Sequence, residues 1–294
     1  MSSNNLSILS KVSAADIIHD PYPHIVIENA LDETLFQELF ESLPPEKLVL
    51  DGREKKNTWF DYPACKVVNN SEITPLWQAF FRYHTSPEFY LELLEIFGGT
   101  LRNLHPSIEK KLGKPLEESV VAMRPGGRQD RLAENADISM ECQFYVNYTT
   151  QQRAVRGPHV DRPSELFAAL LYFRSPDDDS KGGDLVVSKA KQPDTLYPSS
   201  SSIHVDHAPM EINESRVTPT GTGHYQANTL VLFLNSPKSI HSVSSRTATG
   251  IARRHINFCC DLNFDLFSIE KPMRENFKEK LEDTPVIWRL AKWL

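Results

Sequence analysis

Short apolar runs separated by turn residues fill the chain after about residue 118, and they constrain the fold more than any other feature. Six of these runs are rich in Val, Phe and Tyr: residues 119–123, 140–148, 166–173, 184–188, 229–234 and 255–262. Their length and composition are typical of β strands. Because no long helical pattern lies between them, this region is predicted to form an antiparallel sandwich or jelly roll.

The residues before this β-rich region show a different pattern. Residues 22–28 are predicted to form a strand. Three helices are then expected. The first begins at an N-cap Asp and ends at a Pro (32–44), the second begins at a Thr-Pro pair at residue 74, and the third begins at a Ser-Pro pair and ends at Gly-Gly (86–99). Their Trp, Phe and Leu residues recur at helical spacing, which indicates core packing.

Together these patterns predict an α+β protein in three parts. Residues 1–117 supply a strand and helices that pack on a barrel, residues 118–270 form the β core, and residues 271–294 form a C-terminal helical tail. Within the core, residues 124–137 and 191–228 are polar and carry Gly or Ser, Pro and Thr, which is typical of loops. Such loops are expected to border the mouth of a cavity.

Composition argues against several classes of partner. The 294 residues include 32 Lys and Arg against 39 Asp and Glu, and no basic stripe stands out, so nucleic acid is not expected. No stretch reaches the roughly 18 apolar residues of a membrane span, and no apolar run of signal-peptide length opens the chain. The cysteines lack the C-x-x-C spacing of a zinc site and resemble buried thiols of a reducing compartment: Cys65, Cys142, Cys259 and Cys260. We therefore expect a cytoplasmic protein without a membrane partner, and the oligomeric state stays open.

His159, Asp161 and His241 form the candidate metal site. His159 and Asp161 are two residues apart, so at the end of a strand their side chains point the same way. His241 follows Asp161 by 80 residues, just after another apolar strand. Two imidazoles and one carboxylate occupy one face of an octahedral iron(II) ion and leave three positions for cosubstrate and oxygen. The plain alternative is a jelly roll that happens to contain two histidines.

A second H-x-D motif, His204-Val205-Asp206, shows how weak this motif is alone. It lies among Ser, Pro and Asn, and no apolar strand follows it. We interpret it as part of a surface loop or lid.

Arg253 is the candidate partner for the remote carboxylate of an oxo-acid cosubstrate, because a buried guanidinium binds carboxylate with two hydrogen bonds. Arg254 is the alternative. In a strand, Arg254 shares a face with Ile256 and Phe258, which are expected to pack under the helices. Arg253 would then point into the polar interior, so the alternation favours it. His255 either supports the site residues or fills the barrel.

In this order, the motifs resemble the prolyl 4-hydroxylase-like branch of the iron(II)- and 2-oxoglutarate-dependent dioxygenases. That branch carries H-x-D, an apolar strand, a Gly-Gly turn before a Leu-rich strand, a distal His-x-Val and an Arg beyond a Gly. The corresponding segments here are His159-Val160-Asp161, residues 166–173, Gly182-Gly183-Asp184-Leu185, His241-Ser242-Val243, Gly250 and Arg253. The resemblance covers most of residues 21–265, and it departs from the branch in the spacing to the arginine and in the long insertion at 191–228.

The resemblance implies a double-stranded β-helix core (jelly roll, cupin-like) with flanking N-terminal helices, in an enzyme that uses Fe(II), 2-oxoglutarate and O2. It implies hydroxylation of an unactivated C–H bond in a small-molecule or amino-acid-type substrate, with release of succinate and CO2. Tyr148 is expected to reach the 2-oxoglutarate pocket, with Phe144 and Val146 on the same inward face. The alternative is a cupin-like metal-binding protein without oxygenase activity. An oxidative halogenase is disfavoured because Asp161 occupies the position that halide needs.

Overall fold

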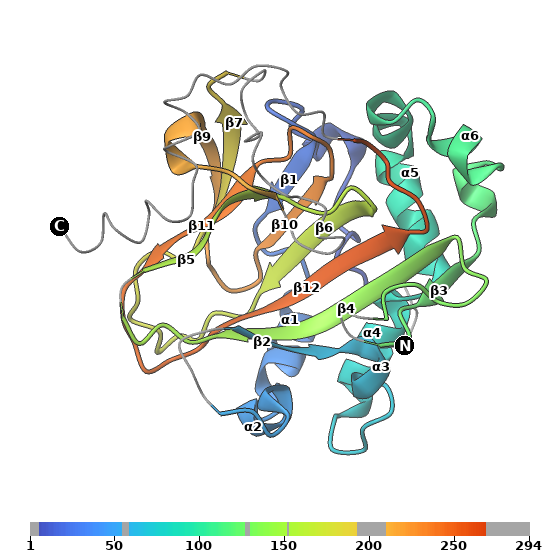
Figure 1. Cartoon of the computed structure of the whole chain (residues 1–294). Helices are drawn as coiled ribbons and strands as arrows, with labels where there is room; N and C mark the ends of the chain where they lie inside the picture. Colours follow the sequence, from blue (N-terminus) through green and yellow to red (C-terminus); the bar gives the residue numbers. More distant parts are fainter. Residues whose placement is uncertain (1–5, 55–58, 127–129, 152, 193–209, 269–294) are drawn as a thin grey trace.

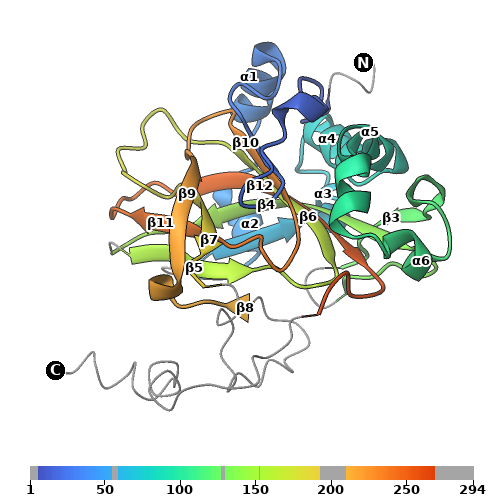
Figure 2. The same ribbon diagram turned by 90° about the horizontal axis from the view of Figure 1, so that it is seen from above.

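Two sheets lie face to face, and helices cover the outer face of the larger sheet (Figure 1). The computed structural model describes residues 6–54, 59–126, 130–151, 153–192 and 210–268. In a view from above, α4 and α5 lie on the side of the larger sheet away from β5, β7 and β9 (Figure 2). The fold is α+β, as the sequence predicts.

The larger sheet has the strand order β1-β10-β6-β12-β4-β2, and short β3 pairs in parallel with β4. Its strands are β1 (His24–Ile27), β2 (Trp59–Pro63), β3 (Val121–Met123), β4 (Ile138–Asn147), β6 (Glu165–Tyr172), β10 (Leu230–Leu234) and β12 (Arg253–Leu262). All six apolar runs are strands, as predicted, and five of them belong to this sheet. β1 and β2 precede residue 118, so the N-terminal segment supplies strands of the same sheet.

The smaller sheet has the order β8-β5-β11-β7-β9. Its strands are β5 (Arg153–Val160), β7 (Leu185–Ala190), β8 (Met210–Glu211), β9 (Val217–Gly223) and β11 (His241–Arg246). The prediction that residues 191–228 form one loop is therefore wrong for β8 and β9. β9 is polar because it is an edge strand, and only its end residues Val217 and Gly223 are buried. The second H-x-D motif falls in 193–209, outside the described residues.

The helices are α1 (Glu33–Glu41), α2 (Glu46–Leu50), α3 (Ala64–Val67), α4 (Pro75–His84), α5 (Pro87–Leu104) and α6 (Ile108–Leu112). The predicted N-cap side chains of α1, α4 and α5 each accept a backbone N–H: Asp32, Thr74 and Ser86. α5 does not end at Gly98-Gly99 as predicted. It continues because Leu101, one turn beyond Gly98, is buried in the core, so packing outweighs the low helix propensity of glycine. The predicted C-terminal helix at 271–294 lies outside the described residues.

The main hydrophobic core lies between the larger sheet and the helices. Trp77 of α4 is fully buried, and its ring centroid lies 4.7 Å from that of Phe144 on β4. Ile256 and Phe258 of β12 belong to the same core, as predicted from the alternation. Because neighbouring strand residues point to opposite faces, the intervening residues of β4 and β12 face the smaller sheet, and many of them are polar.

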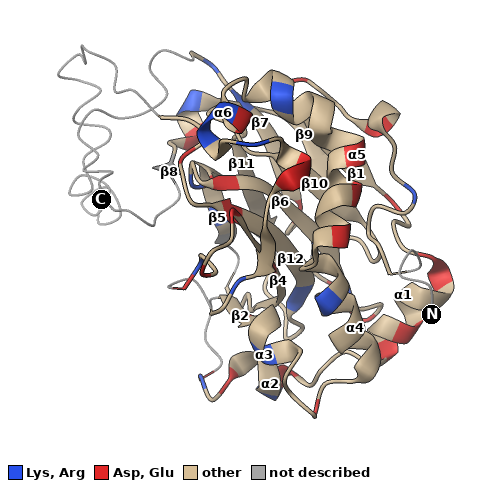
Figure 3. Ribbon diagram, turned by 90° about the vertical axis from the view of Figure 1, so that its right-hand side faces the viewer, with Lys and Arg blue, Asp and Glu red and all other residues tan. Residues whose placement is uncertain are grey.

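Both acidic and basic residues occur along the described ribbon. On the side that carries α5 and α6, several acidic positions lie along α5 and basic positions lie near α6, and the Lys and Arg positions do not form one stripe across this side (Figure 3). Among the described residues, no helix has both the length and the apolar character required to cross a membrane. Cys142, Cys259 and Cys260 are buried as free thiols, as expected, and Cys65 is half-buried.

Candidate metal centre

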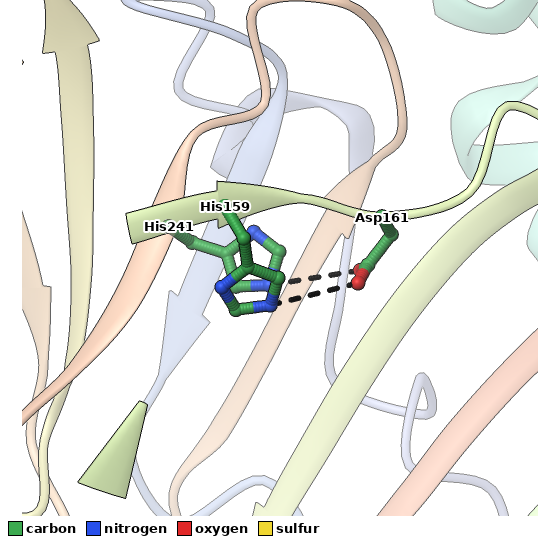
Figure 4. A group of neighbouring side chains, drawn as sticks. All are labelled: His159, Asp161 and His241. Carbon is green, nitrogen blue, oxygen red and sulfur yellow. Dashed lines mark ion pairs between the residues drawn. The ribbon is translucent and has the colours of Figure 1, made fainter. Parts of the chain in front are cut away.

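The structure brings His159, Asp161 and His241 together in the space between the two sheets (Figure 4). His159 is near the end of β5, Asp161 directly follows that strand, and His241 begins β11. β5 and β11 pair so that His159 and His241 are directly opposite each other. The three ligand atoms lie within 4.8 Å of one another, and all three side chains line one cavity.

The two imidazoles are held in matching orientations. Nδ1 of His159 lies 2.9 Å from the carbonyl oxygen of Gly157, and Nδ1 of His241 lies 2.9 Å from that of Ser239. A carbonyl oxygen only accepts hydrogen bonds, so each Nδ1 carries the proton and each Nε2 keeps a lone pair. Both Nε2 atoms face the carboxylate of Asp161, at 3.7 Å from His159 and 3.6 Å from His241.

Burial keeps both imidazoles neutral. The pKa of His159 lies well below its usual value, chiefly because of desolvation and further because of His241 and Arg156. Desolvation also lowers the pKa of His241, although the nearby Asp161 carboxylate opposes this shift. Neutral imidazole is the form that binds metals, so the local electrostatics favour the ligand state of both side chains.

This donor set fits a divalent transition metal. Two atoms each about 2.1 Å from one ion are at most about 4.2 Å apart, and the two Nε2-to-carboxylate distances fall below that limit. Nitrogen and carboxylate donors without thiolate suit iron(II) and similar ions. The carbonyls bonded to the Nδ1 atoms are the outer partners that usually orient metal-binding histidines.

Arg253 lines the same cavity from β12 of the facing sheet and is 1% exposed. Its Nε donates to the carbonyl of Gly183 at 2.7 Å, and its Nη2 donates to the hydroxyl of Tyr172 at 3.2 Å. The guanidinium carbon lies 5.0 Å from the ring centroid of Tyr172 and 5.1 Å from that of Tyr225. In the described part of the chain, no carboxylate forms an ion pair with this guanidinium, so its charge is available to an anion in the cavity.

Arg254 points to the other face of β12, where it forms an ion pair with Glu46 at 3.0 Å. Tyr148 is on that face too. Its hydroxyl donates to Glu46 at 2.8 Å, and its ring packs in the main core beside Phe60. The prediction that Tyr148 reaches the cosubstrate pocket is therefore wrong. Tyr148 does share a face with Phe144 and Val146, but the helices cover that face.

The inward positions of β4 are instead Gln143 and Tyr145, which line the cavity. The ring of Tyr145 stacks on Trp59 of β2 and lies 4.6 Å from the ring of His255. His255 in turn contacts Arg253, with 3.1 Å between Nδ1 and Nη1. Sequence reasoning missed Gln143 and Tyr145, although shifting the assumed inward face of β4 by one position would have found them.

The cavity has a volume of about 180 Å³, and among the described residues only the 124–137 segment of the two predicted loops contributes to its lining. Arg124, the first residue of the 124–137 segment, lines it directly. In the 191–228 segment, β8 pairs with β5 at His159 and Val160, next to the metal centre. The expectation that both segments border the mouth of the cavity stays a prediction, since the described residues place only Arg124 in its lining and β8 beside His159.

Comparisons with known proteins give matches only among solved structures. No protein-family model matches the chain, and neither does any curated protein. The chain is similar to a prolyl 4-hydroxylase from Phytophthora capsici, with a TM-score of 0.44, 13% identity, and coverage of 99% of this chain and 73% of that one. It is also similar to a Pseudomonas putida prolyl 4-hydroxylase, with a TM-score of 0.39, 12% identity, and coverage of 81% and 91%.

A third similar structure is HygX from Streptomyces hygroscopicus, solved with nickel and 2-oxoglutarate bound. Its TM-score is 0.34 at 13% identity, and the match covers 86% of each chain. TM-scores below 0.5 at such identities do not transfer a function from one protein to another. Any inference about chemistry therefore has to come from the geometry of the site.

Proposed function

We propose that this chain is an Fe(II)- and 2-oxoglutarate-dependent oxygenase. The observation that carries the proposal is that the triad of His159, Asp161 and His241 and the buried Arg253 line one cavity from two facing sheets. Metal ligands alone would suit several metalloproteins. A buried guanidinium in the same cavity adds a specific site for a dicarboxylate such as 2-oxoglutarate.

The strand order supports a double-stranded β-helix. The inner four strands of the larger sheet run β10-β6-β12-β4, and four strands of the smaller sheet run β5-β11-β7-β9. From β4 to β7 and again from β10 to β12, successive strands alternate between the two sheets. This winding places the end of β5 and the start of β11 side by side, which is where the triad lies.

Each site residue then has a defined task. His159, Asp161 and His241 would hold the iron, which supplies the redox chemistry of oxygen activation when it is bound. Arg253 would bind the carboxylate of 2-oxoglutarate that is remote from the metal, and Tyr172 and Tyr225 keep this guanidinium oriented. The proposed reaction converts substrate C–H, 2-oxoglutarate and O2 into substrate C–OH, succinate and CO2, so one oxygen atom enters each of the first two products.

Apolar side chains complete the cavity wall around the polar groups: Ala168, Leu170, Leu185, Phe233 and Val243. The ring of Phe233 lies 4.3 Å from that of His241 and shields it from water. A dry wall of this kind protects a reactive centre from side reactions with solvent.

The test is whether metal binding, 2-oxoglutarate binding and succinate formation depend on one another. Anaerobic protein is loaded with Fe(II) and titrated with 2-oxoglutarate, with the charge-transfer absorption of the chelate as the signal. Air is then admitted and succinate is quantified. We expect 2-oxoglutarate to bind tightly only with metal and succinate to form. A protein that binds Fe(II) but neither binds 2-oxoglutarate nor forms succinate would be the cupin-like alternative.

A further inference from the structure

Buried polar atoms without a hydrogen-bond partner gather in one place within the described part of the chain. They are Arg124 Nε, Glu141 Oε2, Gln143 Nε2 and Arg162 Nε. Three of the four are donors, and the side chains that carry these donors line the cavity of the metal centre. Native proteins rarely leave buried donors unpaired, because each one loses its hydrogen bonds to water without a replacement. We call Arg124, Gln143 and Arg162 the donor wall.

The donor wall lies toward the other end of β12 from Arg253. Gln143 is directly opposite Asn257 in the pairing of β4 with β12, four residues beyond Arg253. Arg124 lies further along, where its Nη2 forms an ion pair with Asp261. Both Arg253 and the donor wall therefore line the same cavity, at different positions along β12.

Ion pairs with acidic side chains hold the two arginines of the donor wall in place. Arg124 is 2% exposed and is held by Asp261 and, at 3.7 Å, by Glu141. Arg162 forms an ion pair with Glu165. These contacts use the Nη atoms and leave the Nε donors unpaired. Side chains fixed in this way are preorganised donors, because a ligand does not have to order them.

The charged residues and the unpaired donors of the lining indicate the kind of ligand. Four arginines line the cavity, against two acids, Asp161 and Glu165. In the proposed function, Asp161 binds the metal and Arg253 binds 2-oxoglutarate. Without these two residues, the charged residues of the lining are Glu165 and three arginines, Arg124, Arg156 and Arg162. Asp261, Glu141 and Glu165 offset much of this positive charge, so the unpaired donors make the selection. An ammonium group offers only donors and would leave these three unpaired, whereas a carboxylate offers about four acceptor positions to them.

We infer that Arg124, Gln143 and Arg162 form a second carboxylate-binding subsite, and that the substrate of this chain therefore carries a carboxylate near the C–H bond that is oxidised. The inference rests on the proposed function, because the triad marks where the reacting atom would lie. A neutral amide would fill the space less well, since its own N–H groups would face donors.

The first test compares three probes of one size: propionate, propionamide and propylamine. Each is titrated by calorimetry into anaerobic Fe(II) protein that is saturated with 2-oxoglutarate, so that Arg253 and the metal are already occupied. We expect propionate to bind about tenfold or more tightly than propionamide, and propylamine not to bind. Equal or tighter binding of propionamide or propylamine, or no binding of propionate, overturns the inference.

The second test uses Gln143→Leu, which keeps the side-chain size and removes the unpaired donor. We expect propionate affinity to fall about tenfold, 2-oxoglutarate affinity to stay unchanged, and the melting temperature without ligand to stay equal or rise. Gln78→Leu is the matched control. Its Nε2 already donates to the carbonyls of Asn70 and Ile73, so its loss should lower the melting temperature without affecting propionate.

The two failures are distinguishable. If 2-oxoglutarate does not bind, the proposed function fails, and propionate is then titrated alone into wild type, Gln143→Leu and Arg253→Ala. Dependence on Gln143 still supports the subsite, whereas dependence on Arg253 alone overturns it. If 2-oxoglutarate binds but Gln143→Leu leaves propionate affinity unchanged or lowers the melting temperature as Gln78→Leu does, only the second subsite is refuted.

Discussion

Arg253 and Arg254 are neighbours on β12, and their guanidinium groups lie on opposite faces of the larger sheet. Arg253 lines the cavity between the sheets, whereas Arg254 forms an ion pair with Glu46 of α2. The chain therefore contains its own matched control for the cosubstrate site, because Arg253→Ala and Arg254→Ala remove the same guanidinium group from adjacent positions.

Arg253→Ala is expected to retain metal binding and to weaken 2-oxoglutarate binding by about 2–5 kcal/mol, because it removes a buried charged contact to the cosubstrate. Arg254→Ala removes a half-buried ion pair and should change stability by less than about 1 kcal/mol without affecting 2-oxoglutarate. Anaerobic titration of the Fe(II) protein gives both affinities. Loss of binding in Arg254→Ala alone would contradict the assignment of the faces.

Asp161→Ala is expected to lower the affinity for Fe(II) by more than about 100-fold, since loss of a direct ligand should exceed the effect of losing an outer partner. The second H-x-D motif offers the control: Asp206→Ala should leave the affinity unchanged. Calorimetric titration with Fe(II) under anaerobic conditions measures both. If Asp206→Ala abolishes binding and Asp161→Ala does not, the metal site has been assigned to the wrong motif.

Gly182→Ala is expected to destabilise the fold by at least about 2 kcal/mol. Gly182 has a φ of +78°, and a Cβ there would lie 1.9 Å from the carbonyl oxygen of Ser245. Gly99→Ala inside α5 is the control. A Cβ at that position meets no heavy atom within 4 Å, so the free energy of unfolding should rise by roughly 0.5–1 kcal/mol. Urea unfolding followed by circular dichroism gives both values, and equal stability of the two variants would refute the turn geometry.

His84 should make stability depend on pH. Its ring is fully buried, its Nε2 accepts the N–H of Ile8, and desolvation lowers its pKa to about 3. Below about pH 6.5, His84 binds a proton in the unfolded chain but stays neutral in the folded chain. The free energy of unfolding therefore falls as the pH drops from about 6.5 toward 3. This single group contributes a slope of up to about 1.4 kcal/mol per pH unit.

The measurement for His84 is urea unfolding between about pH 4 and 6, for wild type and His84→Gln. Other buried histidines contribute to both proteins, so the difference in slope isolates this one. We expect the slope of the variant to be smaller by about one proton. Parallel curves would show that the folded protein protonates His84 as readily as the unfolded chain does.

The sequence alone determined the features that depend on local, periodic properties. Apolar runs of strand length identified six strands, and N-cap residues located the starts of three helices. The two-residue period of a strand was enough to separate Arg253 from Arg254, because Ile256 and Phe258 mark the buried face. The same period placed His159 and Asp161 on one side of the chain.

Tertiary structure decided what alternation leaves open. A strand pattern shows which residues share a face, but it does not show what that face contacts. Both faces of β4 are buried, one under helices and one against the second sheet. The sequence of β4 therefore did not show that Tyr148 faces the helices and Gln143 faces the cavity. The donor wall is also invisible along the chain, because its members come from three separate segments that meet only when the sheets pack. Whether a buried donor has a partner depends on such non-local contacts, and only the folded chain reveals them.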